Sequence, residues 1–359
     1  MFRFTSWVCL IFLAQFFNNL KADDDLLLKV GAYVDAYYSS DNDYLPNQME
    51  SKEFRKFSYV NAAKDEFGLN TAQITALLKY GNHIRGNVTI HAGDLKTSAW
   101  LEENKYIQQA NGGVRLFDNL WLDAGYFLTH IGGEAVLPKD NWLTSHSLVT
   151  LLEPFYQAGF RLSYETEKFT GQIHLLNGYA IAEDNNYNKS LGWFAYYALS
   201  KEISLSYAGI LGNEEPGNPS NSKVLQLHNF VAYLDFFENL SMKAQVDFAQ
   251  RQNTKPDGND YTAGSYLGAS FQARYKLLEK LNTTFRFSYI NNDYVFPVYQ
   301  FSEINGMDFT LGVEYKPTQT SFIRLEGRMM NFDDKYKLFN EGKDNSRMEA
   351  MLNIGIWID

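Results

Sequence analysis

The stretch TAQITALLKYGNHIRGNVTIHA, residues 71–92, contains two runs in which apolar or small residues alternate with polar ones. The first run covers residues 72–80 and the second covers 84–92, and Gly81 and Asn82 join them. Successive side chains of a β-strand point to opposite faces, so each run has one apolar face and one polar face. We therefore predict a tight hairpin of two strands, each with one face on water.

The same alternation recurs from about Leu26 to the C-terminus in segments of roughly ten residues, which is typical of a transmembrane β-barrel. Short and long connections between the segments take turns. Outer-membrane barrels keep short turns on the periplasmic side and long loops outside, whereas a soluble β-sandwich mixes connection lengths. We predict an all-β, up-and-down antiparallel barrel of about 16 strands over residues 23–359. Its long external connections are expected at 39–66, 94–104, 130–156, 179–190, 213–223, 252–264, 293–305 and 333–345.

Residues 1–22 have the features of a cleaved signal peptide. Arg3 gives a positive start, residues 7–17 form an apolar stretch, and Ala22 offers a small residue for cleavage. The rest of the chain has no apolar run of about 18 residues, the length that a membrane-spanning helix requires. We expect export through this signal and residence in the outer membrane, with membrane lipid as a partner.

The amino-acid composition excludes several further kinds of chemistry and partner. The single cysteine, Cys9, lies inside the predicted signal, so the exported chain can use neither disulfides nor thiol chemistry. Phe, Tyr and Trp make up 16% of the residues, as expected for aromatic belts at two membrane interfaces. The net charge of −10 argues against nucleic acid as a partner.

Charged residues at every second strand position must face the barrel lumen, because a midplane Arg or Lys on the lipid face costs about 2–4 kcal/mol. A barrel of about sixteen strands is too wide for its wall side chains to fill, so we expect water inside. Pairing of these charges across the wall is the alternative for any single residue. The predicted pore-lining residues are Arg85, Arg115, Arg161, Arg274, Arg286, Arg324 and Arg328.

The third long connection, residues 130–156, is the candidate constriction, because the third external loop of general porins folds into the lumen. It carries the acids Glu134, Asp140 and Glu153, with Lys139 as its only base. We expect these acids to face the arginine-bearing wall and to bias the pore toward cations. Charge on the external loops can also serve hydration alone.

No catalytic, cofactor-binding or metal-binding constellation is predicted. The six histidines show no metal-ligand spacing. Ser145, His146 and Ser147 are neighbours in a loop, whereas a hydrolase needs its serine and histidine fixed opposite each other on a rigid scaffold.

Three motifs resemble the putative β-barrel porin-2 family of Gram-negative outer membranes. They are GYFLTHIGGE at 125–134 with the serine-flanked His146, EPFYQAG at 153–159, and LNGY at 176–179 with the polar residues after it. The chain departs from the family pattern at Gly133, His146 and Gln157, where an aromatic, an arginine and a histidine are usual. The resemblance implies an outer-membrane barrel with pore activity and leaves the solute undefined.

The leading functional expectation is a porin, a passive diffusion channel for small hydrophilic solutes or ions. A non-conducting surface barrel for adhesion or scaffolding, or a barrel enzyme, are the alternatives. The alternating run at residues 348–356 resembles the C-terminal signal read by the barrel-assembly machinery, a further expected partner. A homotrimer is compatible with such a barrel.

Overall fold

The computed structural model describes residues 25–44, 54–100, 105–184, 186–215, 217 and 222–359. The predicted signal peptide, residues 1–22, lies outside them. Within these ranges no helix has the length and apolar character needed to cross a membrane. The strands are β1 (Leu26–Asp41), β2 (Glu66–Tyr80), β3 (Ile84–Ala92), β4 (Ile107–Phe117), β5 (Leu120–Leu128), β6 (Tyr156–Glu165), β7 (Phe169–Leu176), β8 (Ser190–Ala198), β9 (Ile203–Asn213), β10 (Val224–Phe237), β11 (Leu240–Asp257), β12 (Asp260–Leu278), β13 (Leu281–Val298), β14 (Phe301–Tyr315), β15 (Ser321–Phe332) and β16 (Ser346–Ile358).

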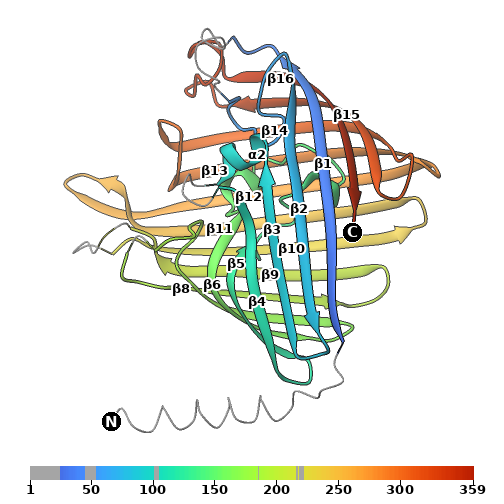
Figure 1. Ribbon diagram of the computed structural model, residues 1–359. Helices are drawn as coiled ribbons and strands as arrows, with labels where there is room; N and C mark the ends of the chain where they lie inside the picture. Colours follow the sequence, from blue (N-terminus) through green and yellow to red (C-terminus); the bar gives the residue numbers. More distant parts are fainter. Residues whose placement is uncertain (1–24, 45–53, 101–104, 185, 216, 218–221) are drawn as a thin grey trace.

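The strands form one closed barrel in which each pairs with its neighbours in the chain, all antiparallel (Figure 1). The last strand closes the ring on the first, with Val34 opposite Ile356 and Ala36 opposite Ile354. Closure is required because lipid cannot satisfy the hydrogen-bonding groups of a free sheet edge. The predicted up-and-down barrel of sixteen strands is confirmed.

The two faces of the wall follow the predicted alternation. Val88 is 52% exposed and Leu311 is 59% exposed on the outside, whereas Thr89 and Asp123 on the inside are each 1% exposed. The apolar face therefore points to lipid and the polar face to the lumen.

On β14 the outward positions from Met307 to Tyr315 are all apolar, and Asn305 bounds them on the external side. Asn291 lies opposite Asn305 on β13, so a polar row continues around this side of the barrel. At about 3.4 Å per residue and a tilt of about 40°, the stretch 307–315 spans about 21 Å along the membrane normal. That height is close to the apolar band of about 25 Å that outer-membrane barrels present to lipid.

Two of the predicted long loops are strands instead. Segments 252–264 and 293–305 extend β11 to β14 beyond the polar row, and the two hairpins end in short turns, one of them at Gly258. The β11–β12 extension is largely exposed on both faces, whereas the β13–β14 extension carries buried apolar residues such as Val298 and Ile304 on the inside. Neither extension therefore shows the alternation of an apolar outer face and a polar inner face. The ladder hydrogen bonds need no apolar face and continue.

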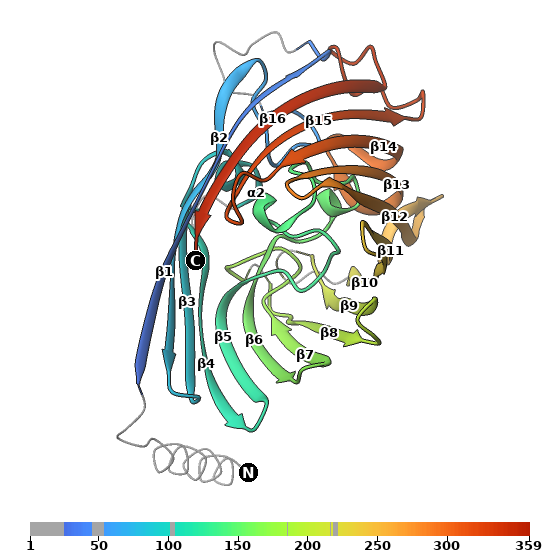
Figure 2. The same cartoon turned by 90° about the vertical axis from the view of Figure 1, so that its right-hand side faces the viewer.

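The interior of the barrel is largely occupied by its own external connections (Figure 2). The connection between β5 and β6, residues 129–155, is called loop 3 here and contains the short 3-10 helices η2 (Pro138–Asp140) and η3 (Thr150–Leu152). The connection between β1 and β2, residues 42–65, is called loop 1. The helix α2 (Asp94–Ala99) follows β3 and packs against β2. Apolar side chains of loop 3, such as Leu148 and Val149, join inward-facing wall residues in one buried cluster.

Candidate functional site in the barrel lumen

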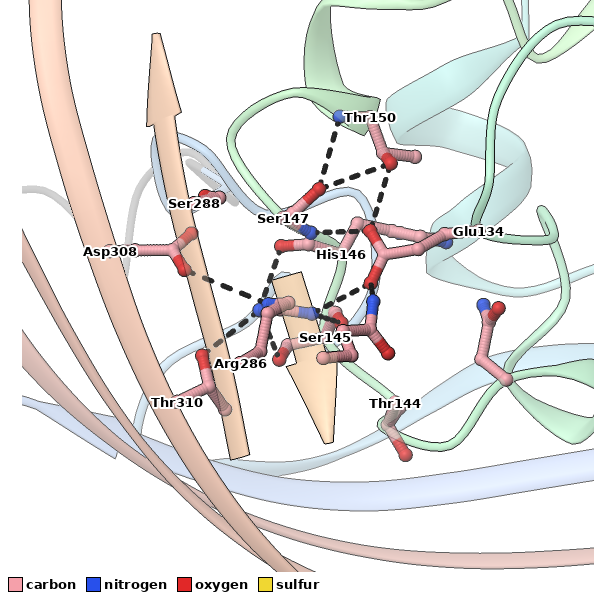
Figure 3. Close-up of polar contacts among 12 residues, drawn as sticks. Glu134, Thr144, Ser145, His146, Ser147, Thr150, Arg286, Ser288, Asp308 and Thr310 are labelled. Atoms are coloured by element: carbon pink, nitrogen blue, oxygen red, sulfur yellow. Dashed lines mark hydrogen bonds and ion pairs between the residues drawn. The ribbon is translucent and has the colours of Figure 1, made fainter. Parts of the chain in front are cut away.

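Glu134 is a central attachment of loop 3 to the wall (Figure 3). Its carboxylate accepts hydrogen bonds from the Ser147 backbone N–H and the Thr150 hydroxyl, both at 2.8 Å, inside the loop. From the wall, the Gln272 amide donates to it at 2.6 Å and the Arg286 guanidinium at 3.1 Å. Burial would raise the pKa of Glu134, but the positive charges of the nearby arginine and lysine hold it well below its usual range. The carboxylate is therefore ionised while it holds the loop.

The guanidinium of Arg286 binds the backbone of the same loop. Besides Glu134, its donors reach the Ser145 hydroxyl at 3.0 Å, the His146 carbonyl at 3.1 Å and the Ser145 carbonyl. Asp308 of β14 supports it from the wall at 3.6 Å and also accepts from the Leu148 backbone N–H at 3.1 Å. Since arginine presents five fixed donors, it can fix a turn of irregular backbone against a flat wall.

The tip of loop 3 descends far toward the periplasmic end. Arg324 donates to the Pro138 carbonyl at 2.8 Å and to the Asn141 carbonyl at 2.6 Å. It lies only three positions after the start of β15, at about 3.4 Å per residue from the periplasmic turn. Glu326 accepts from the Ser145 hydroxyl at 2.7 Å. Loop 3 thus crosses most of the membrane depth inside the barrel.

A further attachment lies at the two ends of loop 3. Lys243 donates to the Gly133 carbonyl at 2.6 Å, and Gln245 donates to the Glu153 carboxyl. Glu153 lies next to Asp247 in a fully buried site, where Asn229 donates to Asp247 at 2.6 Å. Burial and the neighbouring acid raise the pKa of Glu153 well above its usual range. This carboxyl therefore favours its neutral, protonated form.

The described residues 54–65 of loop 1 lie in the lumen beside β15, β16 and β1. Arg55 forms ion pairs with Asp41 at 3.0 Å and with Glu349 at 2.8 Å, and all three side chains are buried. Arg328 donates to the Phe57 carbonyl at 3.1 Å and to Asp308 at 2.6 Å. Wall charges on this side are thus used to hold the loop.

An opening in the lumen lies between loop 3 and the wall formed by β6 to β11. It is a cavity of about 600 Å³. Its lining includes Arg161, Gln172, Phe194, Tyr196, Ser206, Tyr233 and Lys243 from the wall, and residues 128–136, Asp140 and Trp142 from β5 and loop 3.

A charge cluster on β3, β5 and β6 lies beside this cavity. Arg85 binds Asp123 with two hydrogen bonds of 2.7 Å, reaches Glu165 at 2.9 Å, and stacks over Trp121 at 4.5 Å. Arg161 contacts the same Asp123 through its Nε at 3.2 Å. Two arginines thus share one buried carboxylate.

The structure divides the predicted pore-lining arginines into two groups. Arg286, Arg324 and Arg328 are at most 3% exposed, so as placed they anchor loops and do not border open space. The other four, Arg85, Arg115, Arg161 and Arg274, keep partly open side chains. Their pore-lining role stays a prediction.

The three acids of loop 3 also divide into buried and exposed residues. Glu134 and Glu153 are buried anchors, whereas Asp140 is half exposed and contacts Lys139 at 3.1 Å. We expected all three acids to face the arginine-bearing wall; Glu134 pairs with the wall residue Arg286, whereas Glu153 lies beside Asp247. The prediction that acids of loop 3 favour cations therefore applies to Asp140 alone, and it stays a prediction.

Four wall residues that complete these anchors carry no distinguishing mark in the sequence: Asn229, Gln245, Gln272 and Asp308. They lie at the polar, inward-facing positions of their strands, and this position was the feature of the sequence that could have indicated their role. Ser145 and His146 bond to Glu326 and to the Ala135 carbonyl, and no hydrogen bond between these two side chains is found in the described part of the chain. Nor do the described residues include a group of three or more His, Cys, Asp or Glu arranged to hold a metal ion.

Comparison with known proteins settles the family. The model of the family described as putative beta-barrel porin-2, OmpL-like, matches residues 27–357. The chain belongs to this family. No curated protein matches the sequence significantly.

Solved structures of similar fold include outer-membrane proteins of several bacteria. An OmpT of Vibrio cholerae with loop L8 deleted is 10% identical, with a TM-score of 0.62 over 93% of this chain and 99% of that one. An anion-selective porin from Comamonas acidovorans is 7% identical, with a TM-score of 0.64 over 93% of this chain and 100% of that one. The outer membrane channel DcaP of Acinetobacter baumannii is 12% identical, with a TM-score of 0.60 over 94% and 99%. At these identities the likeness concerns the fold.

Proposed function

We propose that this member of the porin-2 family is a passive diffusion channel of the outer membrane for small hydrophilic solutes or ions. The observation that carries the proposal is a closed sixteen-strand barrel with an apolar outer band, a polar inner face and a long loop fastened inside. A barrel of this kind provides an aqueous path across the membrane through its lumen. The inserted loop sets the width of that path.

The proposed constriction is the cavity between loop 3 and the wall of β6 to β11, beside the charge cluster on β3, β5 and β6. The opposite side of the lumen is closed by buried contacts of Arg55, Arg286 and Arg324. On the open side stand Arg85 and Arg161, which remain partly exposed. A passing solute would therefore meet loop residues on one side and arginines on the other.

Planar-bilayer recording of the purified protein tests this proposal. We expect stepwise conductance, and a larger step after shortening the loop tip by removing residues 137–143. As a matched control, the external β11–β12 hairpin can be shortened by removing residues 254–263, which lie beyond the apolar band. Unchanged conductance in the loop-tip variant would show that loop 3 does not set the constriction.

One observation favours a second candidate, a barrel that does not conduct. Loops 1 and 3 bury many wall charges, and the β11–β12 and β13–β14 hairpins project beyond the membrane as surfaces for contact. Absence of any conductance, together with binding of the intact barrel to a surface partner, would favour adhesion or scaffolding over transport.

Two features of maturation are also part of the proposal. Residues 1–22 are removed on export, and the barrel-assembly machinery inserts the mature chain through its C-terminal strand. Mass spectrometry of the membrane form should show a chain that begins near Asp23. We further propose a homotrimer; an in-vitro folded OmpT of Vibrio cholerae has been solved in a trimer form. Light scattering of the detergent-solubilised protein would distinguish a trimer from a monomer.

A further inference from the structure

The cavity between loop 3 and the β6–β11 wall presents hydrogen-bond donors that no group of the described chain engages. The Nε of Arg161 contacts Asp123, but its two terminal nitrogens have no partner among the described residues. The side-chain carbonyl oxygen of Gln172 accepts a hydrogen bond from His174 at 3.1 Å. The amide NH₂ of Gln172 is therefore available to a ligand. The hydroxyls of Tyr196 and Ser206 lie in the same lining. A set of open donors is suited to a ligand rich in acceptor oxygens.

The rest of the lining is apolar and aromatic. Phe194 and Tyr233 come from the wall, and Trp142 comes from loop 3. The ammonium of Lys243 lies 5.4 Å from the Trp142 ring centre and 5.9 Å from that of Tyr233. Pockets of this kind, with apolar walls and a few placed polar groups, bind small organic molecules when their volume is about 300–1,000 Å³. The cavity of about 600 Å³ falls within that range.

The acids near the cavity are already compensated. Asp123 is held by two hydrogen bonds from Arg85, Glu134 is paired with Arg286, and Asp140 contacts Lys139.

In the charge cluster beside the cavity, the two arginines, Arg85 and Arg161, are balanced by two acids, Asp123 and Glu165. Burial lowers the pKa of His130, which also borders the cavity, so that ring adds no charge at neutral pH. Arg161 shares the Asp123 carboxylate with Arg85 and contacts it through Nε alone, so its two terminal nitrogens remain open to a ligand in the cavity. An anion placed there would gain charge-assisted hydrogen bonds.

We infer that this cavity is a binding site for small organic anions, in which a carboxylate contacts Arg161 and an apolar or aromatic body packs against Phe194, Tyr233 and Trp142. The inference rests on the proposed channel function and names the class of solute that the constriction retains. Neutral polar solutes would pass without being held, because they offer no charge to the guanidinium.

The test uses the mature full-length protein in planar bilayers with benzoate as the probe. We expect benzoate to reduce the single-channel current in a concentration-dependent way, and benzyl alcohol and benzylammonium to have little effect. Arg161→Gln should raise the benzoate concentration for half-block by about tenfold or more. The fold should survive because Arg85 continues to hold Asp123.

Lys335→Gln is the matched control, because it removes one positive charge from an exposed external residue that pairs with Glu303. It should leave the benzoate block unchanged. Equal block by all three probes, or an unaltered block in Arg161→Gln, would overturn the inference and leave the channel proposal standing. If the wild-type protein does not conduct, the channel proposal fails. Calorimetric titration of the detergent-solubilised wild type and Arg161→Gln with benzoate then decides the anion site: weaker binding by the variant supports it, and equal or absent binding refutes it.

Discussion

Glu134 of loop 3 and Arg286 of β13 form an ion pair 3.1 Å long, and both side chains are almost completely buried. They are far apart in the sequence, yet each satisfies the charge of the other inside the barrel. Because a buried charge without a partner is very unfavourable, this pair makes the position of the loop part of the stability of the barrel.

Glu134→Gln should therefore destabilise the protein strongly. The change leaves Arg286 without its loop carboxylate, and breaking a buried pair costs about 3–5 kcal/mol. Thermal unfolding followed by tryptophan fluorescence would measure the loss. Asp140→Asn, which removes an acid from an exposed position on the same loop, should change stability by no more than about 0.5 kcal/mol. Equal effects of the two variants would contradict the anchoring role.

Glu153 should make stability depend on pH in the opposite sense to an ordinary ionised carboxylate. Its pKa is raised in the folded protein, mainly by burial and then by Asp247, so the folded state binds the proton more tightly than the unfolded state. Its contribution is complete below the unfolded pKa of about 4.3 and declines as the pH rises above that value. Glu153→Gln keeps the hydrogen-bonding shape without the ionisation. We expect a flatter stability curve as the pH rises above the unfolded pKa, and an unchanged slope would refute the assignment.

Gly125 should not accept a side chain. Its φ is +129°, a value that favours glycine, and a Cβ there would lie 2.2 Å from the Ala110 carbonyl oxygen. Gly125→Ala should lower the yield of folded barrel, seen as loss of the heat-modifiable band on a gel. Gly327→Ala is the control, because a Cβ at that position meets nothing within 4 Å. Normal folding of both variants would show that the close strand contact can relax.

Neighbouring residues on β7 should report the two faces of the wall. Gln172 lines the cavity, whereas Ile173 is 59% exposed on the lipid side. A cysteine in place of Gln172 should react with a water-soluble maleimide in intact membranes, and one in place of Ile173 should not. The experiment is clean because the only native cysteine, Cys9, lies in the segment expected to be removed. Equal labelling would contradict the assigned orientation.

Asp140 should be the loop acid that influences ion selectivity. It alone of the three predicted acids reaches solvent beside the cavity. Asp140→Lys should shift the reversal potential toward anions, and the shift should grow at low salt, where the charge is less screened. Glu153→Gln is the control, since its carboxyl is buried and favours the neutral form. A similar shift in both variants, or in neither, would contradict this role.

The sequence by itself determined the fold, because strand periodicity is local. A run such as residues 72–80 shows its lipid face in its own spacing, and the alternation of short and long connections gives the up-and-down order. Position in that order also pointed to residues 130–156 as the inserted loop. The external strand extensions escaped prediction because neither alternates an apolar outer face with a polar inner face: one is exposed on both faces, and the other has buried apolar residues inside.

Only the tertiary structure decided which charges bind the loop and which remain open. Glu134, Asp140 and Glu153 are equivalent as letters in the sequence, yet one is an ionised anchor, one is exposed and one favours its protonated form. The difference comes from Arg286, Lys243 and Asp247, which are distant in the chain and close in space. The free energy of a charge depends on its burial and on its neighbours in space, and neither quantity is contained in local spacing.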